Sequence, residues 1–265
     1  MDTRIAERRA EVRRDRMLRR RRRTLWIVVL VTVGGLLAWL ERSPLVALQR
    51  VEVVGASRID PAAVRDAAAL PLGRSTLRLR LSDVRSRVEA LPLVHRATVR
   101  RVDPLTVRIT VEERRPRLVV HTAGAAAVID QDGVVLEHRP LPDGAAEASR
   151  ADAPPVVVTT AAQPPPPGDT VDGVPGAASA LRVHRQLPGP LRSQVERYDA
   201  TQVDDLALIL TNGVRVRFGR AERIDEKARV VGALLDEWSG TVIARIDVRA
   251  PSNPVVLEAG PPPPA

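Results

Sequence analysis

Residues 105–112 read Leu-Thr-Val-Arg-Ile-Thr-Val-Glu, and apolar and polar side chains alternate along the whole stretch. Successive side chains of a β-strand point to opposite faces, so the odd-numbered residues are expected on one buried face. The even-numbered residues, Thr106, Arg108, Thr110 and Glu112, are expected on the other face. A second alternating run, residues 97–102, precedes this one across Asp103-Pro104. The pattern predicts a hairpin with a single buried face.

The residues before this hairpin predict one strand and two helices. A β-branched run at residues 51–55 ends in Gly and is typical of a strand. Asp60-Pro61 supplies an N-cap and a first helical residue, and Ser82 is expected to cap a second helix that Pro92 ends. The order over residues 48–116 is β-α-α-β-β, which predicts an α+β layer with two helices on one side of a three-stranded sheet.

The next 140 or so residues read as a second, mostly antiparallel β domain with helices. Asn212-Gly213 between two apolar runs is a strong hairpin signal. The Asp130-to-Gly133 segment is interpreted as a tight turn, because a calcium loop would need more ordered ligands. Pro, Gly, Ala and Asp dominate residues 137–154 and 160–176, which are expected to be mobile surface excursions. Strands are predicted at 119–120, 127–129, 134–136, 156–158, 194–199, 206–210, 214–218, 242–248 and 255–257, and helices at 177–187 and 224–238.

Residues 24–40 carry no charge and follow five consecutive arginines, which predicts a single membrane-spanning helix. At roughly 1.5 Å per residue the run is about 25 Å long, at the short end for a span. Trp26 and Trp39 lie near its two ends, where aromatic rings prefer the lipid headgroups. Residues 1–23 hold eleven Arg against four acidic residues, a net charge of +7, so the N-terminus is expected in the cytoplasm and the C-terminus outside.

Two other interpretations of the N-terminus are weaker. A cleaved signal peptide would have an unusually long basic region here, and no Ala-x-Ala pattern follows the apolar run. Nucleic-acid binding by the arginines lacks interleaved aromatic residues, and the topology already explains the charge. The whole-chain charge of +9 leaves only +2 for residues 24–265, and the chain has no Cys, so the exported region depends on apolar packing.

No group of residues indicates catalysis, a cofactor or a metal. The four histidines (His95, His121, His138 and His184) are isolated from one another and are expected at surfaces or turns. Asp204-Asp205 is interpreted as the exposed entrance to a strand. Lys227, the only lysine, is expected on a solvated helical face as an ordinary salt-bridge partner. The sequence therefore predicts a protein that is not an enzyme.

Several linked motifs carry a resemblance to a known family. They are Val51-x-Val53-x-Gly55, Leu77-x-Leu79-x-Leu81, Leu91-Pro92-x-Val94-x-x-Ala97-x-Val99-Arg100 and Pro104-x-Thr106-Val107-x-Ile109-x-Val111-x-Glu113-Arg114-x-Pro116. This region resembles the POTRA domain of the bacterial cell-division FtsQ/DivIB family. Asn212-Gly213-Val214, Gly219, Lys227 and Ile246-Asp247-Val248-Arg249-x-Pro251 resemble the β domain of that family.

The N-terminal charge pattern and the resemblance together predict a layout in five parts. These are a basic cytoplasmic tail (1–23), a transmembrane helix (24–42), a POTRA domain (43–116), an FtsQ-type β domain (117–258) and a disordered tail (259–265). The resemblance also implies a scaffold at the division septum that binds FtsB- and FtsL-like bitopic proteins and helps control the septal synthesis proteins FtsW and FtsI.

The last strand is the expected partner-binding site. The resemblance implies that it is an exposed edge to which a strand of an FtsB-like partner adds. Pro251 and Pro254 cannot donate hydrogen bonds, so the usable ladder shortens to about residues 255–258. The expected contact residues are Ser252, Val255, Val256, Leu257 and Glu258.

Two other functions remain open at this point. The first is a POTRA protein that handles outer-membrane polypeptides, although no series of barrel strands follows. The second is a membrane-anchored extracytoplasmic sensor or hydrolase, which would need a catalytic or ligand cluster.

Overall fold

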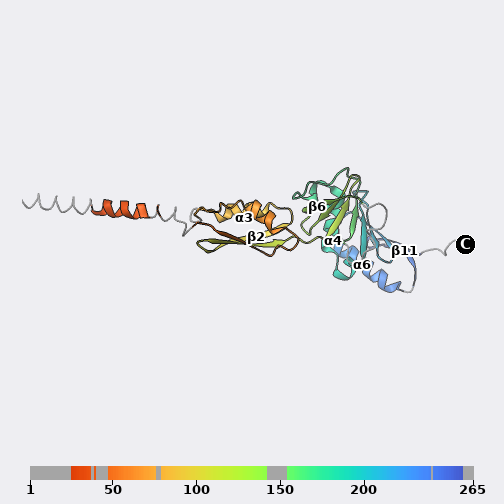
Figure 1. The fold of residues 1–265 in the computed structure, drawn as a ribbon. Helices are drawn as coiled ribbons and strands as arrows, with labels where there is room; N and C mark the ends of the chain where they lie inside the picture. Colours follow the sequence, from red (N-terminus) through yellow and green to blue (C-terminus); the bar gives the residue numbers. More distant parts are fainter. Residues whose placement is uncertain are drawn as a thin grey trace, which may run out of the picture. The chain divides into compact units, whose positions relative to one another are not determined.

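The computed structural model describes residues 25–36, 39, 47–75, 79–141, 154–239 and 241–258 (Figure 1). The predicted basic tail (1–23) and C-terminal tail (259–265) lie outside these residues. Residues 25–36 are helical, and Trp26 and Trp39 are 71% and 63% exposed. Among the described residues, no helix is both long enough and apolar enough to cross a membrane. The chain divides into two compact units, the second of which includes residues 57–59 and 89–96 together with 112–265.

The predicted β-α-α-β-β order makes up most of the first unit, although β2 starts and β3 ends in residues that belong to the second unit. Its three-stranded sheet has the order β1-β3-β2, with β3 in the centre and β1 parallel to it. Two helices cover one side of this sheet (Figure 1). The elements are β1 (Arg50–Val54), α2 (Pro61–Ala68), α3 (Leu81–Glu89), β2 (Val94–Asp103) and β3 (Thr106–Glu113).

The local signals in this unit explain most of its structure. The Asp60 side chain accepts a hydrogen bond from the Ala62 amide at 2.8 Å and caps α2, as predicted. Val107 and Ile109 on β3 are fully buried, as the alternation predicts. Two predictions were wrong. Thr106, expected on the polar face, is buried at the start of β3. Ser82, expected as the N-cap of the second helix, lies inside α3, which begins at Leu81.

The second unit is built on a nine-stranded sheet, with the strand order β12-β11-β10-β9-β8-β7-β4-β5-β6. Five of its neighbouring pairs are antiparallel and three are parallel. The strands are β4 (Leu118–His121), β5 (Ala126–Ile129), β6 (Val135–Arg139), β7 (Val156–Val158), β8 (Val195–Asp199), β9 (Leu206–Leu210), β10 (Arg215–Gly219), β11 (Ile243–Asp247) and β12 (Val255–Glu258). The helices are η3 (Val171–Gly173), α4 (Pro175–Gln186), α5 (Gly189–Arg192) and α6 (Ile224–Glu237).

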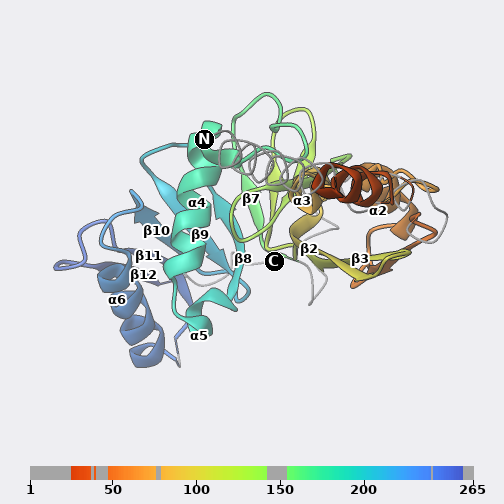
Figure 2. The same cartoon turned by 90° about the vertical axis from the view of Figure 1, so that its left-hand side faces the viewer.

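The two long helices cover one face of this sheet (Figure 2). Each joins a pair of parallel strands: the chain reaches β8 from β7 through α4, and reaches β11 from β10 through α6. The strand register aligns one row of side chains under the helices across seven strands, all of them buried except the last, which is partly buried. In order from β4 to β12 the row is Val120, Val157, Tyr198, Leu208, Val216, Ile246 and Val256.

The predicted surface excursions of this unit need correction, and one short helix was missed. Residues 160–176 are not a mobile excursion, because Val171 is fully buried in the core and Thr170 forms a β-bridge with Val134. The short helix α5 was not predicted at all. Residues 137–139 belong to β6, whereas residues 142–153 lie outside the described parts of the chain.

Candidate functional site at the edge of the large sheet

The strand β12 is one of the two edges of the nine-stranded sheet. It pairs with β11 in antiparallel register, and no described residue pairs with its other side. Every second backbone N–H and C=O of an antiparallel edge strand points away from the sheet and is open to another strand. Ser252 is exposed in the turn before β12, and Glu258 is exposed at its end.

The register decides which side chains of β12 face which way. Val256 lies opposite Ile246 and packs against the core beneath the helices. Val255 and Leu257 point to the opposite face of the sheet and are 59% and 50% exposed. A partner on the open face would therefore meet Val255 and Leu257, whereas Val256 anchors the strand to its own sheet.

A row of arginines continues from Leu257 across the open face. Leu257 lies opposite Arg245, Arg245 opposite Arg215, and Ile209 of β9 separates Arg215 from Arg197. Arg215 forms an ion pair with Asp199 at 2.7 Å. Arg197 and Arg245 are exposed, and neither forms an ion pair with another described residue. The surface beside the edge thus combines apolar side chains with uncompensated positive charge.

The neighbouring row contains a carboxylate that is already paired. Asp247 accepts from the Arg249 guanidinium at 2.8 Å and lies 3.8 Å from Arg217. Partial burial raises the pKa of the Asp247 carboxyl, but hydrogen bonds from Arg249 outweigh it and hold the pKa below its usual value. Asp247 therefore stays ionised and holds two guanidinium groups near the edge.

Lys227 does not lie on a solvated face, and that prediction was wrong. It is 4% exposed, and its ammonium donates to the carbonyls of Phe218 and Arg220, both at 2.9 Å. The nitrogen also lies 5.0 Å from the centroid of the Phe218 ring. These carbonyls lie at the end of β10 and directly after it, so the lysine links α6 to this strand. The sequence placed Lys227 on a helix but carried no signal for these partners.

The histidines are less isolated than their spacing suggests. His184 is buried in α4 rather than at the surface, and its Nδ1 lies 2.9 Å from the Tyr198 hydroxyl. Ligand atoms of His95, Asp130 and Asp132 lie within 4.8 Å of one another. Arg114 already pairs with Asp130 at 2.6 Å, and the other Asp130 oxygen accepts two backbone N–H groups of its own turn. These contacts explain the buried Asp130 carboxylate as part of its own turn.

Comparison with known proteins agrees with the architecture. Residues 46–114 match the model of the POTRA domain, FtsQ-type, and residues 118–249 match that of the cell division protein FtsQ/DivIB C-terminal region. The Cell division protein FtsQ of Streptomyces bingchenggensis is 30% identical over 252 residues, which cover 93% of this chain and 90% of that protein. The chain belongs to the FtsQ/DivIB family.

Other relatives carry the same description. The Cell division protein FtsQ of Mycobacteroides abscessus is 30% identical over 88% of this chain and 69% of its own length. That of Corynebacterium glutamicum is 24% identical over 84% of this chain and 95% of its own length. As a member of the FtsQ/DivIB family, the protein has a role in cell division.

Proposed function

We propose that the protein is a non-enzymatic divisome scaffold whose β12 edge takes up a strand of an FtsB-like partner. The observation that supports this most directly is the position of β12, which pairs with β11 on one side only among the described residues. Backbone pairing would supply affinity, and the side chains at alternate positions would supply specificity. FtsL-like, FtsW and FtsI proteins would join or respond to this complex, as the family resemblance implies.

The surroundings of β12 favour a particular kind of partner. Val255 and Leu257 offer apolar contacts, and Arg245 and Arg197 extend the same face with positive charge. A partner segment with apolar side chains on one face and acidic residues beside them would complement both features. Ser252 and Glu258 would flank its ends.

The membrane arrangement is part of the same proposal. Residues 24–40 would cross the cytoplasmic membrane, with the arginine-rich tail inside and both folded units outside, concentrated at the division septum. Single cysteines test this orientation because the chain has none of its own. In intact cells an impermeant thiol reagent should label Val203→Cys, which replaces a 58% exposed side chain, and leave Thr3→Cys unlabelled. The reverse labelling pattern would overturn the proposed topology.

The edge is tested by Leu257→Glu. Burying a leucine that is half exposed contributes roughly 1 kcal/mol or more to an interface, and a new carboxylate also needs desolvation, so affinity for the FtsB-like partner should fall about tenfold or more. The matched control is Val242→Glu, because Val242 is 74% exposed and lies outside β12. Binding is measured with the full-length proteins in detergent, and septation is scored in cells.

A second variant disrupts the strand β12 itself rather than its exposed side chains. Val256→Pro removes one backbone donor from β12 and is expected to abolish partner binding while α6 and the inner strands stay folded. If both Leu257→Glu and Val256→Pro fold, bind the partner with unchanged affinity and support division, the edge proposal fails while the family assignment stands.

A further inference from the structure

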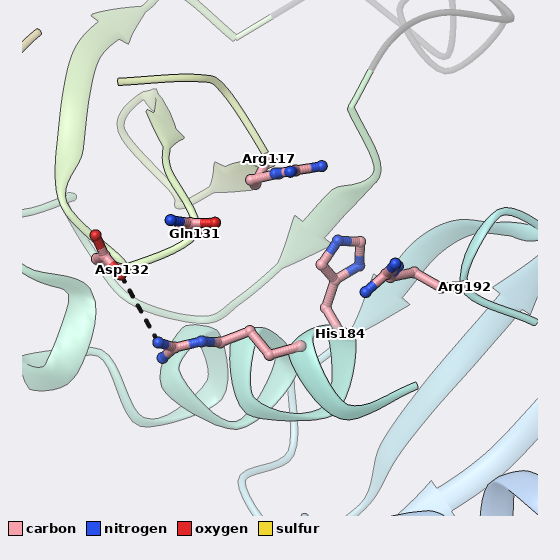
Figure 3. Close-up of a pocket in the computed structure, with 6 residues that line it drawn as sticks. Arg117, Gln131, Asp132, His184 and Arg192 are labelled. Carbon is pink, nitrogen blue, oxygen red and sulfur yellow. Dashed lines mark ion pairs between the residues drawn. The ribbon is translucent and has the colours of Figure 1, made fainter. Parts of the chain in front are cut away.

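A cavity of about 380 Å³ opens on the second unit, away from β12, and basic side chains dominate its lining (Figure 3). Its volume falls in the range of roughly 300–1,000 Å³ that is usual for small-molecule sites. The lining residues are Arg117, Gln131, Asp132, His184, Arg185 and Arg192. They come from the residue before β4, the β5–β6 turn, α4 and the end of α5. Four separate segments therefore converge on one concave surface.

The positive charge of the cavity exceeds the negative charge that its own lining residues supply. Its single carboxylate, Asp132, lies 3.8 Å from Arg185 and 3.4 Å from Arg114, so two guanidinium groups compensate it. Arg117 and Arg192 form no side-chain hydrogen bond or ion pair with any other residue in the described ranges. Figure 3 shows both guanidinium groups near the His184 ring, on the other side of the cavity from the Arg185–Asp132 pair.

His184 gives the cavity a rigid polar floor. The side chain is 9% exposed and the Tyr198 beneath it is fully buried, with their rings 5.8 Å apart in an edge-to-face arrangement. Nδ1 is engaged with the Tyr198 hydroxyl, and Nε2 has no hydrogen-bond partner among the described residues. If Tyr198 donates to Nδ1, the neutral ring carries its proton on Nε2 and can donate it to a ligand.

We infer that this cavity binds a small oxyanion, a phosphate or carboxylate group, held between Arg117 and Arg192 and hydrogen-bonded by His184. The planar guanidinium fork matches both anions with two parallel hydrogen bonds, and the Gln131 amide can add a further donor. The volume leaves room for the molecule that carries the group. The inference does not depend on the β12 edge, because the lining residues and the edge residues do not overlap.

The test uses the full-length protein in a non-ionic detergent and titrates it calorimetrically with three probes. Inorganic phosphate and succinate represent soluble ligands, and mixed micelles containing phosphatidylglycerol represent a lipid headgroup. Arg117→Gln and Arg192→Gln should each weaken binding about tenfold to a hundredfold, since each loses charge-assisted hydrogen bonds. Arg182→Gln is the matched control, because Arg182 is exposed on α4 and does not line the cavity.

The pattern of binding distinguishes a soluble ligand from a lipid headgroup. Binding of phosphate or succinate that is weakened by the two cavity variants and unaffected by Arg182→Gln supports a soluble ligand. Binding of the lipid micelles alone, with the same dependence, supports a headgroup. Binding of no probe, or equal weakening by all three substitutions, overturns the inference. The ring resonances of His184 provide a readout at the site, because they should shift on addition of the bound probe and shift less in Arg192→Gln at the same probe concentration.

Discussion

Lys227→Met tests the structural role of the only lysine. Methionine retains the unbranched apolar stem but removes the ammonium, which donates to the carbonyls of Phe218 and Arg220 at 2.9 Å in a site that is 4% exposed. A hydrogen bond to a charged group contributes about 1.5–3 kcal/mol, and a buried carbonyl left without its donor is costly. Burial disfavours the charged ammonium and lowers the pKa of Lys227. The stability lost in Lys227→Met is therefore smaller than the contribution of two full hydrogen bonds.

The expected loss is about 2–4 kcal/mol of unfolding free energy for the second unit. With a urea dependence of roughly 2 kcal/mol per molar, the unfolding midpoint should fall by about 1–2 M. Trp238 follows α6 directly and packs against the core, so its fluorescence reports on this unit. Replacing Trp26 and Trp39 by phenylalanine leaves it as the only tryptophan in the chain.

Arg229→Met is the matched control, since it removes a cation from an exposed position of the same helix. It should change the unfolding free energy by no more than about 0.5 kcal/mol. Equal midpoints for Lys227→Met and Arg229→Met would refute the assignment of Lys227 as the link between α6 and β10.

Two further predictions concern the core of the first unit and the pH dependence of the second. Ile109→Ala, which removes a fully buried side chain, should cost about 2–5 kcal/mol in thermal unfolding, whereas Arg108→Ala, which loses an exposed ion pair with Glu52, should cost less than about 1 kcal/mol; similar costs would contradict the register of β3. Burial, with the charges of Arg192 and Arg117, lowers the pKa of His184 from 6.5 to about 4. Because the folded protein then binds fewer protons than the unfolded chain between these values, its stability should fall as the pH drops below about 6.5. Urea unfolding at pH 7 and pH 5 should show this fall, and His184→Gln should reduce it; an unchanged pH dependence in that variant would assign the effect to other groups.

The sequence by itself determined the elements that depend on neighbouring residues. The alternation at 105–112 places Val107 and Ile109 in the core, because successive side chains of a β-strand point to opposite faces in any tertiary context. Asp60 caps its helix through an amide two residues away. Gly213 adopts a positive φ of 84° in the hairpin turn that Asn212-Gly213 predicts. Each of these signals is complete within a few residues of chain.

The tertiary structure alone decided which side chains meet. The register of β12 against β11 turns Val256 inward and exposes Val255 and Leu257, although all three are apolar and adjacent in the sequence. Lys227 is buried because α6 crosses back over the end of β10, and His184 reaches Tyr198 because α4 lies on β8. Such contacts depend on strand order and on how each helix packs over the sheet, and no local pattern of residues encodes either one.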